Sequence, residues 1–281
     1  MMFQIRTGQI RQTLCAIIKT IMKIKLSPFC WKCYFESGQT KEDYERVKKE
    51  TGDDIDVEVN DENSYELTCN KGHTSYTQLQ NQKFELLFDI AAMALIDGYT
   101  KECVSTIASS FERFIEFYIK VITVKKNVSV DNFAITWKLM SNQSERQLGA
   151  FYILQMSEYG ETKFPLEPKW VEFRNKVTHK GYIPSASKAI EYGEYILAFI
   201  FSILKHLKEH DLDSIIKAQL IDFSKSGERI PEQQMKASAN IPTIISLSSI
   251  KSSTFGNTTF QKAIDSIPHN GFYKNFYSKT I

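Results

Sequence analysis

Residues 173–181, which read FRNKVTHKG, bring an arginine, an amide and a histidine within six residues of one another. The side chains concerned are those of Arg174, Asn175 and His179. Histidine exchanges a proton near neutral pH, and the planar guanidinium group of arginine holds phosphate oxygens through paired hydrogen bonds. Residues of these types are suited to acid–base chemistry at a phosphate group.

A helix introduced by Pro165 and Pro168 is expected to carry this motif. At about 100° per residue, Asn175 and His179 share the face nearly opposite an apolar stripe, and Arg174 lies at the border of that stripe. The stripe is formed by Trp170, Phe173 and Val177. A histidine needed only for core packing would lie within the stripe, so His179 is predicted to be an outer residue. Two interpretations without chemistry stay open: a cation at a helix end capped by Gly181, or an interface residue.

A second group of residues has the spacing of a metal site. Cys30 and Cys33 are separated by two residues, and Cys69 and His73 by three, with Gly72 at the bend of the second pair. Three thiolates and one imidazole form a tetrahedral zinc set, and four protein ligands leave no open position for water. The pattern resembles a zinc ribbon and predicts a structural zinc ion. The gap of 35 residues between the pairs is long, and unrelated core cysteines are the alternative.

Other chemical signatures are missing or weak. The sequence has no phosphate-binding glycine loop, no dinucleotide-binding glycine motif, no H-E-x-x-H and no G-x-S-x-G. His206 and His210 fall on one helix face, where stabilisation of a helix C-terminus is favoured over metal binding. Glu112 is interpreted as part of a polar helix flank that reaches the motif only if its helix lines the same cleft.

The fold expected around these residues is mainly α, an antiparallel helical bundle preceded by a small zinc-ribbon module. Apolar residues recur at helical spacing, and short connections favour antiparallel neighbours. The expected helices cover residues 84–95, 104–122, 131–141, 144–158, 168–180 and 185–210.

Four regions are predicted along the chain. Residues 1–27 form an N-terminal extension, 28–79 the zinc ribbon, 80–210 the bundle and 211–281 an accessory region. Within the ribbon, IDVEV, SYELT and TSYTQL are expected to be short strands, and KEDYERVKKE a turn or two of helix. The accessory region contains a β-prone run, IPTIISLSSI, and a capped helix in NTTFQKAIDSI.

Composition limits the remaining classes. The 281 residues are 42% hydrophobic with a formal net charge of +2, so a packed core is expected and no global basic field indicates nucleic acid. The longest apolar run, Tyr195 to Leu204, has ten residues, whereas a membrane span needs about 20. Five scattered cysteines do not form a disulfide framework and favour a reducing cytoplasm.

The R-N-x3-H motif of Arg174, Asn175 and His179 resembles the hallmark of the HEPN superfamily. That hallmark is an arginine, a polar residue directly after it, and a histidine four to six residues further on. The motif lies on the penultimate helix of an expected bundle and precedes GYIPS and a long helix, which adds to the resemblance. The resemblance covers about residues 80–210, and it explains neither the ribbon nor the C-terminal region.

The resemblance implies a metal-independent endoribonuclease that acts as a homodimer, with the motif helices of two chains at a shared cleft. His179 would act as general base or acid, Arg174 would stabilise the phosphorane, and Asn175 would orient the histidine or bind the substrate. Lys176, Lys180 and Tyr182 would contact the RNA. It also implies a cytoplasmic role in a toxin or antiphage defence system, with a possible regulatory protein partner.

A binding module without catalysis, which uses the same bundle to hold RNA or a protein, is the main alternative. A zinc-dependent hydrolase is disfavoured because four protein ligands would close the metal site.

Overall fold

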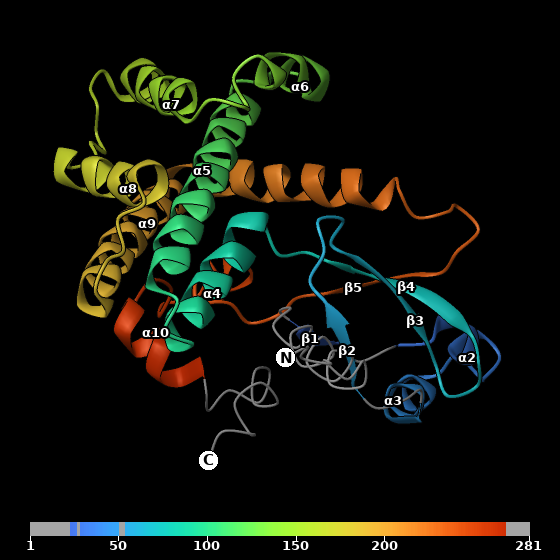
Figure 1. Cartoon of the computed structure of the whole chain (residues 1–281). Coiled ribbons are helices and arrows are strands. Elements are labelled where there is room, and N and C mark those ends of the chain that lie inside the picture. Colours follow the sequence, from blue (N-terminus) through green and yellow to red (C-terminus); the bar gives the residue numbers. More distant parts are fainter. Residues whose placement is uncertain (1–22, 27–28, 51–53, 268–281) are drawn as a thin grey trace, which may run out of the picture. The chain divides into compact units, whose positions relative to one another are not determined.

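The structure is a computed structural model that describes residues 23–26, 29–50 and 54–267 (Figure 1). The chain divides into two compact units. The first comprises Met1–Thr77 with Glu232–Ala237, and the second comprises Gln78–Pro231 with Ser238–Ile281. The first division falls two residues before the expected ribbon boundary at residue 79, whereas the return of 232–237 to the first unit was not expected. Residues 1–22 of the proposed extension lie outside the described residues.

The first unit combines short strands and short helices. β1 (Lys23–Leu26) pairs antiparallel with β2 (Ile55–Glu58), with Leu26 opposite Ile55. The other elements are α2 (Trp31–Phe35), α3 (Lys41–Glu50), β3 (Ser64–Thr68) and β4 (Thr74–Leu79). The strands expected in IDVEV, SYELT and TSYTQL are confirmed. The helix in KEDYERVKKE spans all ten residues.

β4 also belongs to a three-stranded sheet of order β3-β4-β5, in which β5 is Lys236–Ala239. The Tyr76 N–H donates to the Met235 carbonyl, and the Gln80 N–H donates to the Ala239 carbonyl, each at 2.9 Å. The boundary between the two units falls within β4 and β5. The chain therefore passes between the units more than once.

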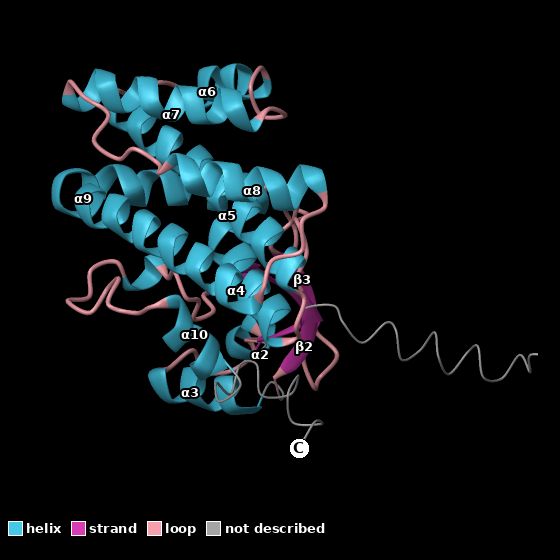
Figure 2. Ribbon diagram, turned by 60° about the vertical axis from the view of Figure 1, so that its left-hand side comes forward, coloured by secondary structure: helices cyan, strands magenta, loops and turns pink. Residues whose placement is uncertain are grey.

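The second unit is helical, and the expectation of a mainly α chain is confirmed (Figure 2). Its helices are α4 (Lys83–Ile96), α5 (Thr100–Lys125), α6 (Val130–Lys138), α7 (Ser144–Tyr159), α8 (Pro168–Lys180), α9 (Ala186–Gly227) and α10 (Phe260–Ser266). α5 packs against α4, α7, α8 and α9. Its buried face includes Phe114, Tyr118 and Ile122, none of which is exposed to solvent. This central helix therefore positions α8, which carries the motif, together with α7 and α9.

The last expected bundle helix is longer than the sequence suggested. It was predicted to end near His210, but α9 continues to Gly227 across a single non-helical residue, Asp211 (φ −143°, ψ 28°). Lys125 on α5 donates to the Asp211 carboxylate at 2.8 Å. Residues 211–227 are therefore the second half of a kinked helix rather than the start of a separate accessory region.

The β-prone run at residues 241–250 does not form a strand. It is an irregular segment with one short 3₁₀ turn, Leu247–Ser249. Its backbone N–H groups find side-chain acceptors instead of a neighbouring strand: Ile241 donates to Asn81, Ile244 to Asp89 and Leu247 to Glu85. Asn81, Glu85 and Asp89 are four residues apart, so they present one face at the start of α4.

α10 confirms the capped helix expected in this region. The Thr259 hydroxyl accepts the Lys262 N–H at 3.2 Å, and the Glu194 carboxylate accepts the Phe260 N–H at 2.8 Å. The Phe260 ring lies 5.5 Å from the ring of Phe88, which anchors α10 in the second unit. Among the described residues, no helix is both long and apolar enough to cross a membrane.

Candidate functional site

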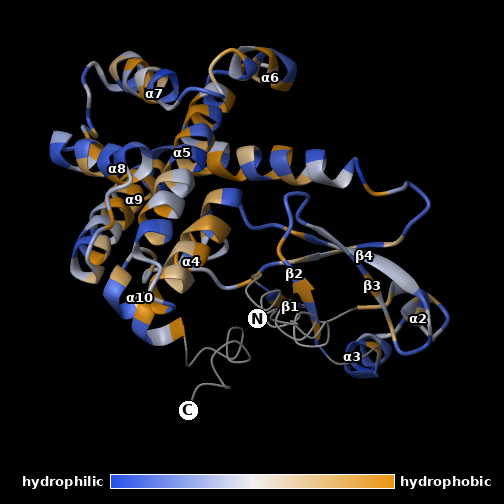
Figure 3. Ribbon diagram, viewed as in Figure 1, coloured by the Kyte–Doolittle hydropathy of each residue, from blue (hydrophilic) through white to orange (hydrophobic). Residues whose placement is uncertain are grey.

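The motif helix α8 begins and ends where its sequence directs. Pro168 occupies the first turn, where its missing N–H costs no hydrogen bond. Gly181 ends the helix in the left-handed region (φ 69°), and the Tyr182 N–H donates back to the Lys176 carbonyl at 3.2 Å. Figure 3 shows α8 as a largely hydrophilic helix. Its buried positions, Trp170 and Val177, belong to the expected apolar stripe.

Arg174 is the centre of the polar cluster on this helix. Its Nη1 donates to the Asn175 Oδ1 at 2.9 Å and lies 3.4 Å from the His179 Nε2. Its Nη2 donates to a carboxylate oxygen of Glu112 on α5. The structure therefore brings together the three side chains predicted from the motif and adds a carboxylate from another helix.

The Arg174–Glu112 ion pair and His179 differ in their exposure to solvent. The Arg174 and Glu112 side chains are 17% and 26% exposed, so their ion pair is partly screened from water. His179 is exposed. Because desolvation strengthens a hydrogen-bonded ion pair, Glu112 fixes the position of the guanidinium group while the histidine stays accessible. Arginine has five N–H donors, so the two nitrogens already engaged leave further donors for an anion.

Glu112 is the functional candidate for which the sequence gave the weakest signal. It lies 62 residues before Arg174, next to Arg113 on α5, and no local motif marks it. Only the packing of α5 against α8 brings the carboxylate to the motif.

The three residues proposed to contact RNA lie outside this cluster. Lys176 and Lys180 are exposed on α8, and within the described residues neither side chain forms a hydrogen bond with Arg174, Asn175 or His179. Tyr182 is 47% exposed, and its ring packs edge-on against Phe173 with centroids 6.3 Å apart. The neighbouring Ile183, four residues after His179 in the chain, is 73% exposed.

The cysteine and histidine residues of the first unit form a second cluster. The potential ligand atoms of Cys30, Cys33, Cys69 and His73 all lie within 4.8 Å of one another. Cys30 caps the N-terminus of α2, with the Cys33 N–H donating to its sulfur at 3.5 Å. Cys69 and His73 lie in the turn between β3 and β4, where Gly72 has a φ of 80°. A short helix and a strand connection thus supply one ligand pair each.

The distances within this cluster match a tetrahedral ion. With metal–sulfur bonds of about 2.3 Å, two sulfurs of a tetrahedron lie about 3.8 Å apart, and a sulfur and a nitrogen slightly closer. Cys33 Sγ lies 3.9 Å from Cys69 Sγ and 3.3 Å from His73 Nδ1, and Cys30 Sγ lies 3.6 Å from the same nitrogen. The four residues therefore fit a metal ion, with Nδ1 as the histidine ligand atom.

The surroundings also suit a metal. Burial opposes ionisation of Cys69, but hydrogen bonds from the backbone N–H groups of His73 and Lys71 and from the side chains of Cys30 and Cys33 together hold the pKa of this thiol below its ordinary value. Burial and the neighbouring Cys30 and Cys69 raise the pKa of Cys33 to about 12, and a bound cation would favour the thiolate form of all three residues. The outer His73 Nε2 faces Glu36 Oε2 at 4.0 Å. A carboxylate at the second ring nitrogen is a common way to orient a metal-binding histidine.

The two histidines of α9 do not belong to a metal-binding group within the described residues. The rings of His206 and His210 lie 4.4 Å apart, and His206 packs edge-on against Tyr159. In the part of the chain that the structure describes, the Cys30 cluster is the one group of three or more side chains arranged to hold a metal ion.

Comparison with known proteins gives no matching family model, no matching curated sequence and no matching solved structure. The residues and geometry of the two clusters are therefore the basis on which a function is assigned to this chain.

Proposed function

We propose that this chain is a HEPN-type endoribonuclease that cleaves RNA without a catalytic metal. The observation that carries the proposal is the cluster on α8, where Arg174 contacts both Asn175 and His179 while the histidine stays exposed. A cation held next to an accessible imidazole is what cleavage by a neighbouring 2′-hydroxyl requires.

Each side chain has a separate role in this proposal. His179 moves the proton of the 2′-hydroxyl or of the leaving oxygen, and the free N–H groups of Arg174 stabilise the charge on the phosphorane. Asn175 and Glu112 hold the guanidinium group in place. Lys176, Lys180 and Tyr182 flank the motif and contact the RNA strand.

One histidine gives a single proton-transfer group, whereas the reaction needs one group to accept a proton and another to donate one. A two-fold dimer supplies two copies of His179 in one cleft. The exposed Tyr182 and Ile183 beside the histidine provide apolar surface for such an interface. As the HEPN resemblance implies, we place this activity in a cytoplasmic toxin or antiphage defence system that a protein partner holds in check.

We further propose that Cys30, Cys33, Cys69 and His73 hold a zinc ion in a zinc-ribbon-like module. Four protein ligands close the coordination sphere, so a zinc ion bound there would stabilise the first unit and would not carry out hydrolysis. The purified chain should contain one zinc ion, and RNA cleavage should not need added magnesium.

The decisive experiment compares Arg174→Ala and His179→Ala with the wild type in an RNA cleavage assay. Both variants should lose activity while circular dichroism and the oligomeric state stay unchanged. His210→Ala removes another exposed histidine of the second unit and is the matched control. Full activity in either motif variant would exclude the proposal. RNA binding without cleavage by the wild type would instead favour the binding module.

A further inference from the structure

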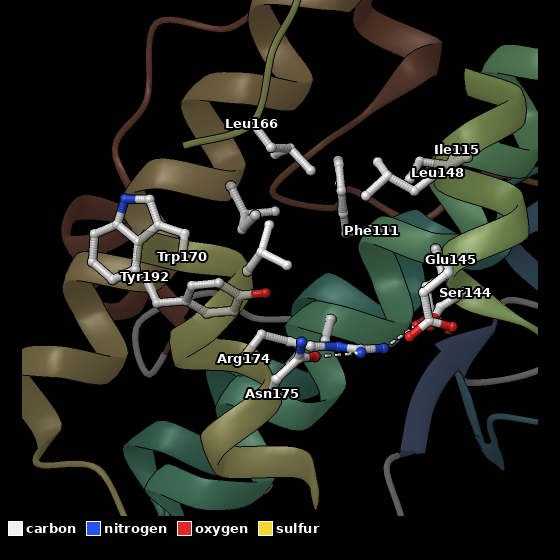
Figure 4. Close-up of a pocket in the computed structure, with 14 residues that line it drawn as sticks. Phe111, Ile115, Ser144, Glu145, Leu148, Leu166, Trp170, Arg174, Asn175 and Tyr192 are labelled. Carbon is white, nitrogen blue, oxygen red and sulfur yellow. Dashed lines mark hydrogen bonds and ion pairs between the residues drawn. The ribbon is translucent and has the colours of Figure 1, made fainter. Parts of the chain in front are cut away.

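A cavity adjoins the polar cluster inside the second unit. It has a volume of about 100 Å³ and lies between residues of α5, α7, α8 and α9 (Figure 4). Its walls are largely apolar and aromatic, formed by Phe111, Ile115, Leu148, Leu166, Trp170 and Tyr192. An apolar cavity of about 150 Å³ holds a benzene ring, so a space of about 100 Å³ excludes a lipid chain or a peptide and admits a single six-membered ring only when the side chains that line it shift slightly.

One end of the cavity is polar. Arg174, Asn175 and Glu112 line it, so the cavity and the proposed catalytic cluster share these residues. Ser144 and Glu145 at the start of α7 complete this end. Glu145 is exposed, and within the described residues its carboxylate has no hydrogen bond or ion pair. The polar end thus offers the remaining N–H donors of Arg174, whose charge is already paired with Glu112, and a free carboxylate acceptor for N–H donors.

These features restrict the ligand. Free phosphate would match Arg174 but would leave the aromatic walls unused. A purely apolar ring would fill the walls but would not use the polar end, where Arg174 has N–H donors beyond those bound to Glu112 and Asn175. A heteroaromatic ring joined to a phosphate satisfies both parts, and nucleotides have this chemistry.

We propose that the cavity binds a nucleobase whose phosphate lies at Arg174. The ring packs between Trp170, Tyr192 and the aliphatic wall, and Glu145 accepts a hydrogen bond from an exocyclic amino group. Carboxylates recognise the cytosine N4 amino group in this way. Bases with an amino group, cytosine first, are therefore favoured over uracil.

The base can belong to an RNA strand or to a free nucleotide. The RNA form rests on the proposed function, because the bound base would then be the one next to the scissile phosphate. The free form needs no cleavage activity and would make the cavity a nucleotide-binding site that influences the cluster through Arg174.

The test uses the full chain and two substitutions on α7. Leu148→Trp fills the cavity without changing the polar cluster, and Ile153→Trp places the same side chain at a position that is 59% exposed and outside the cavity. Glu145→Gln alters the acceptor at an exposed site and is the second variant if Leu148→Trp fails to fold. Thermal unfolding of all variants checks their fold.

Binding of CMP, AMP, GMP, UMP and ribose 5-phosphate is measured by isothermal titration calorimetry. We expect CMP to bind more tightly than UMP and ribose 5-phosphate. Because stacking provides much of the affinity for a base, Leu148→Trp should raise the dissociation constant for CMP at least about tenfold. Ile153→Trp should bind as the wild type does, and Glu145→Gln should reduce the difference between CMP and UMP.

In parallel, a randomised RNA is cleaved and the product ends are sequenced. A base preference that Leu148→Trp removes, while Ile153→Trp keeps it, supports recognition within the RNA strand. CMP binding that Leu148→Trp abolishes, with no base preference or no cleavage at all, supports the free nucleotide and separates the cavity from the nuclease proposal. CMP binding no tighter than ribose 5-phosphate, together with a cleavage preference that Leu148→Trp leaves unchanged, would overturn the inference.

Discussion

The buried carboxyl group of Glu85 predicts an unusual dependence of stability on pH. Its residue is 1% exposed, and burial raises its pKa from 4.5 to about 8. The N–H groups of Gln82 and Leu247 oppose this rise, at 2.5 and 2.8 Å from its oxygens, and the nearby charge of Asp89 adds to it. The folded chain therefore keeps a proton on Glu85 at neutral pH that the unfolded chain releases.

The sign of the effect follows from this difference. Between the unfolded and folded pKa values, the folded state binds more protons, so the free energy of unfolding falls as the pH rises. The contribution of Glu85 is complete below about pH 4.5 and is lost as the pH passes about 8. A difference of about 3.5 pKa units, at about 1.4 kcal/mol each, amounts to about 5 kcal/mol over this range.

Glu85→Gln removes the titration while it keeps an acceptor and a donor of similar size. Urea unfolding should be followed between about pH 5 and pH 8 by tryptophan fluorescence in a Trp31→Phe background, which leaves the two tryptophans of the second unit. As the pH rises through this range, the free energy of unfolding of the variant should increase relative to that of the wild type by about 1.4 kcal/mol per pH unit. Titrating groups that do not interact with Glu85 cancel in this comparison. Parallel pH profiles for the two proteins would refute the assignment of a raised pKa to Glu85.

Three further outcomes are expected. Gly193→Ala should lower the free energy of unfolding of the second unit by about 1–3 kcal/mol, measured by urea unfolding. The added Cβ would lie 2.3 Å from the Phe260 ring, and this overpacking costs more than the helix preference of alanine gains. Cys69→Ser should lower the zinc content of the purified chain, measured by plasma mass spectrometry, and a full complement of zinc would contradict the proposed ligand set. Glu112→Gln should reduce RNA cleavage about tenfold, because a charge-assisted hydrogen bond to Arg174 becomes a neutral one; an unchanged rate would exclude its positioning role.

Local sequence patterns predicted the elements that depend on local geometry. The helix carrying Arg174 and His179, its C-terminal glycine Gly181, and the paired turns of the cysteine cluster all follow from residues less than two turns apart. Helical periodicity and capping preferences act over this range, so a single sequence contains the information.

The features that local patterns did not predict depend on packing between residues far apart in the chain. The β-branched run at residues 241–250 looks like a strand by composition, but Asn81, Glu85 and Asp89 capture its N–H groups from about 160 residues away. Similarly, nothing near Glu112 indicates its pairing with Arg174. Pairing between distant side chains depends on the packing of α4 and α5, which residue patterns along the chain do not encode.

The position of β5 has a consequence for the order in which the protein folds during its synthesis. The cysteine and histidine ligands emerge from the ribosome within a short stretch of chain, so the metal cluster can assemble early. β4 follows directly, but its partner β5 is made roughly 160 residues later, at about 5–20 residues per second. For about ten to thirty seconds one edge of β4 therefore has no neighbour, and the helices α4 to α9 are synthesised before the β3-β4-β5 sheet can close. A bound metal ion during this interval would hold the half-built unit in a folded form.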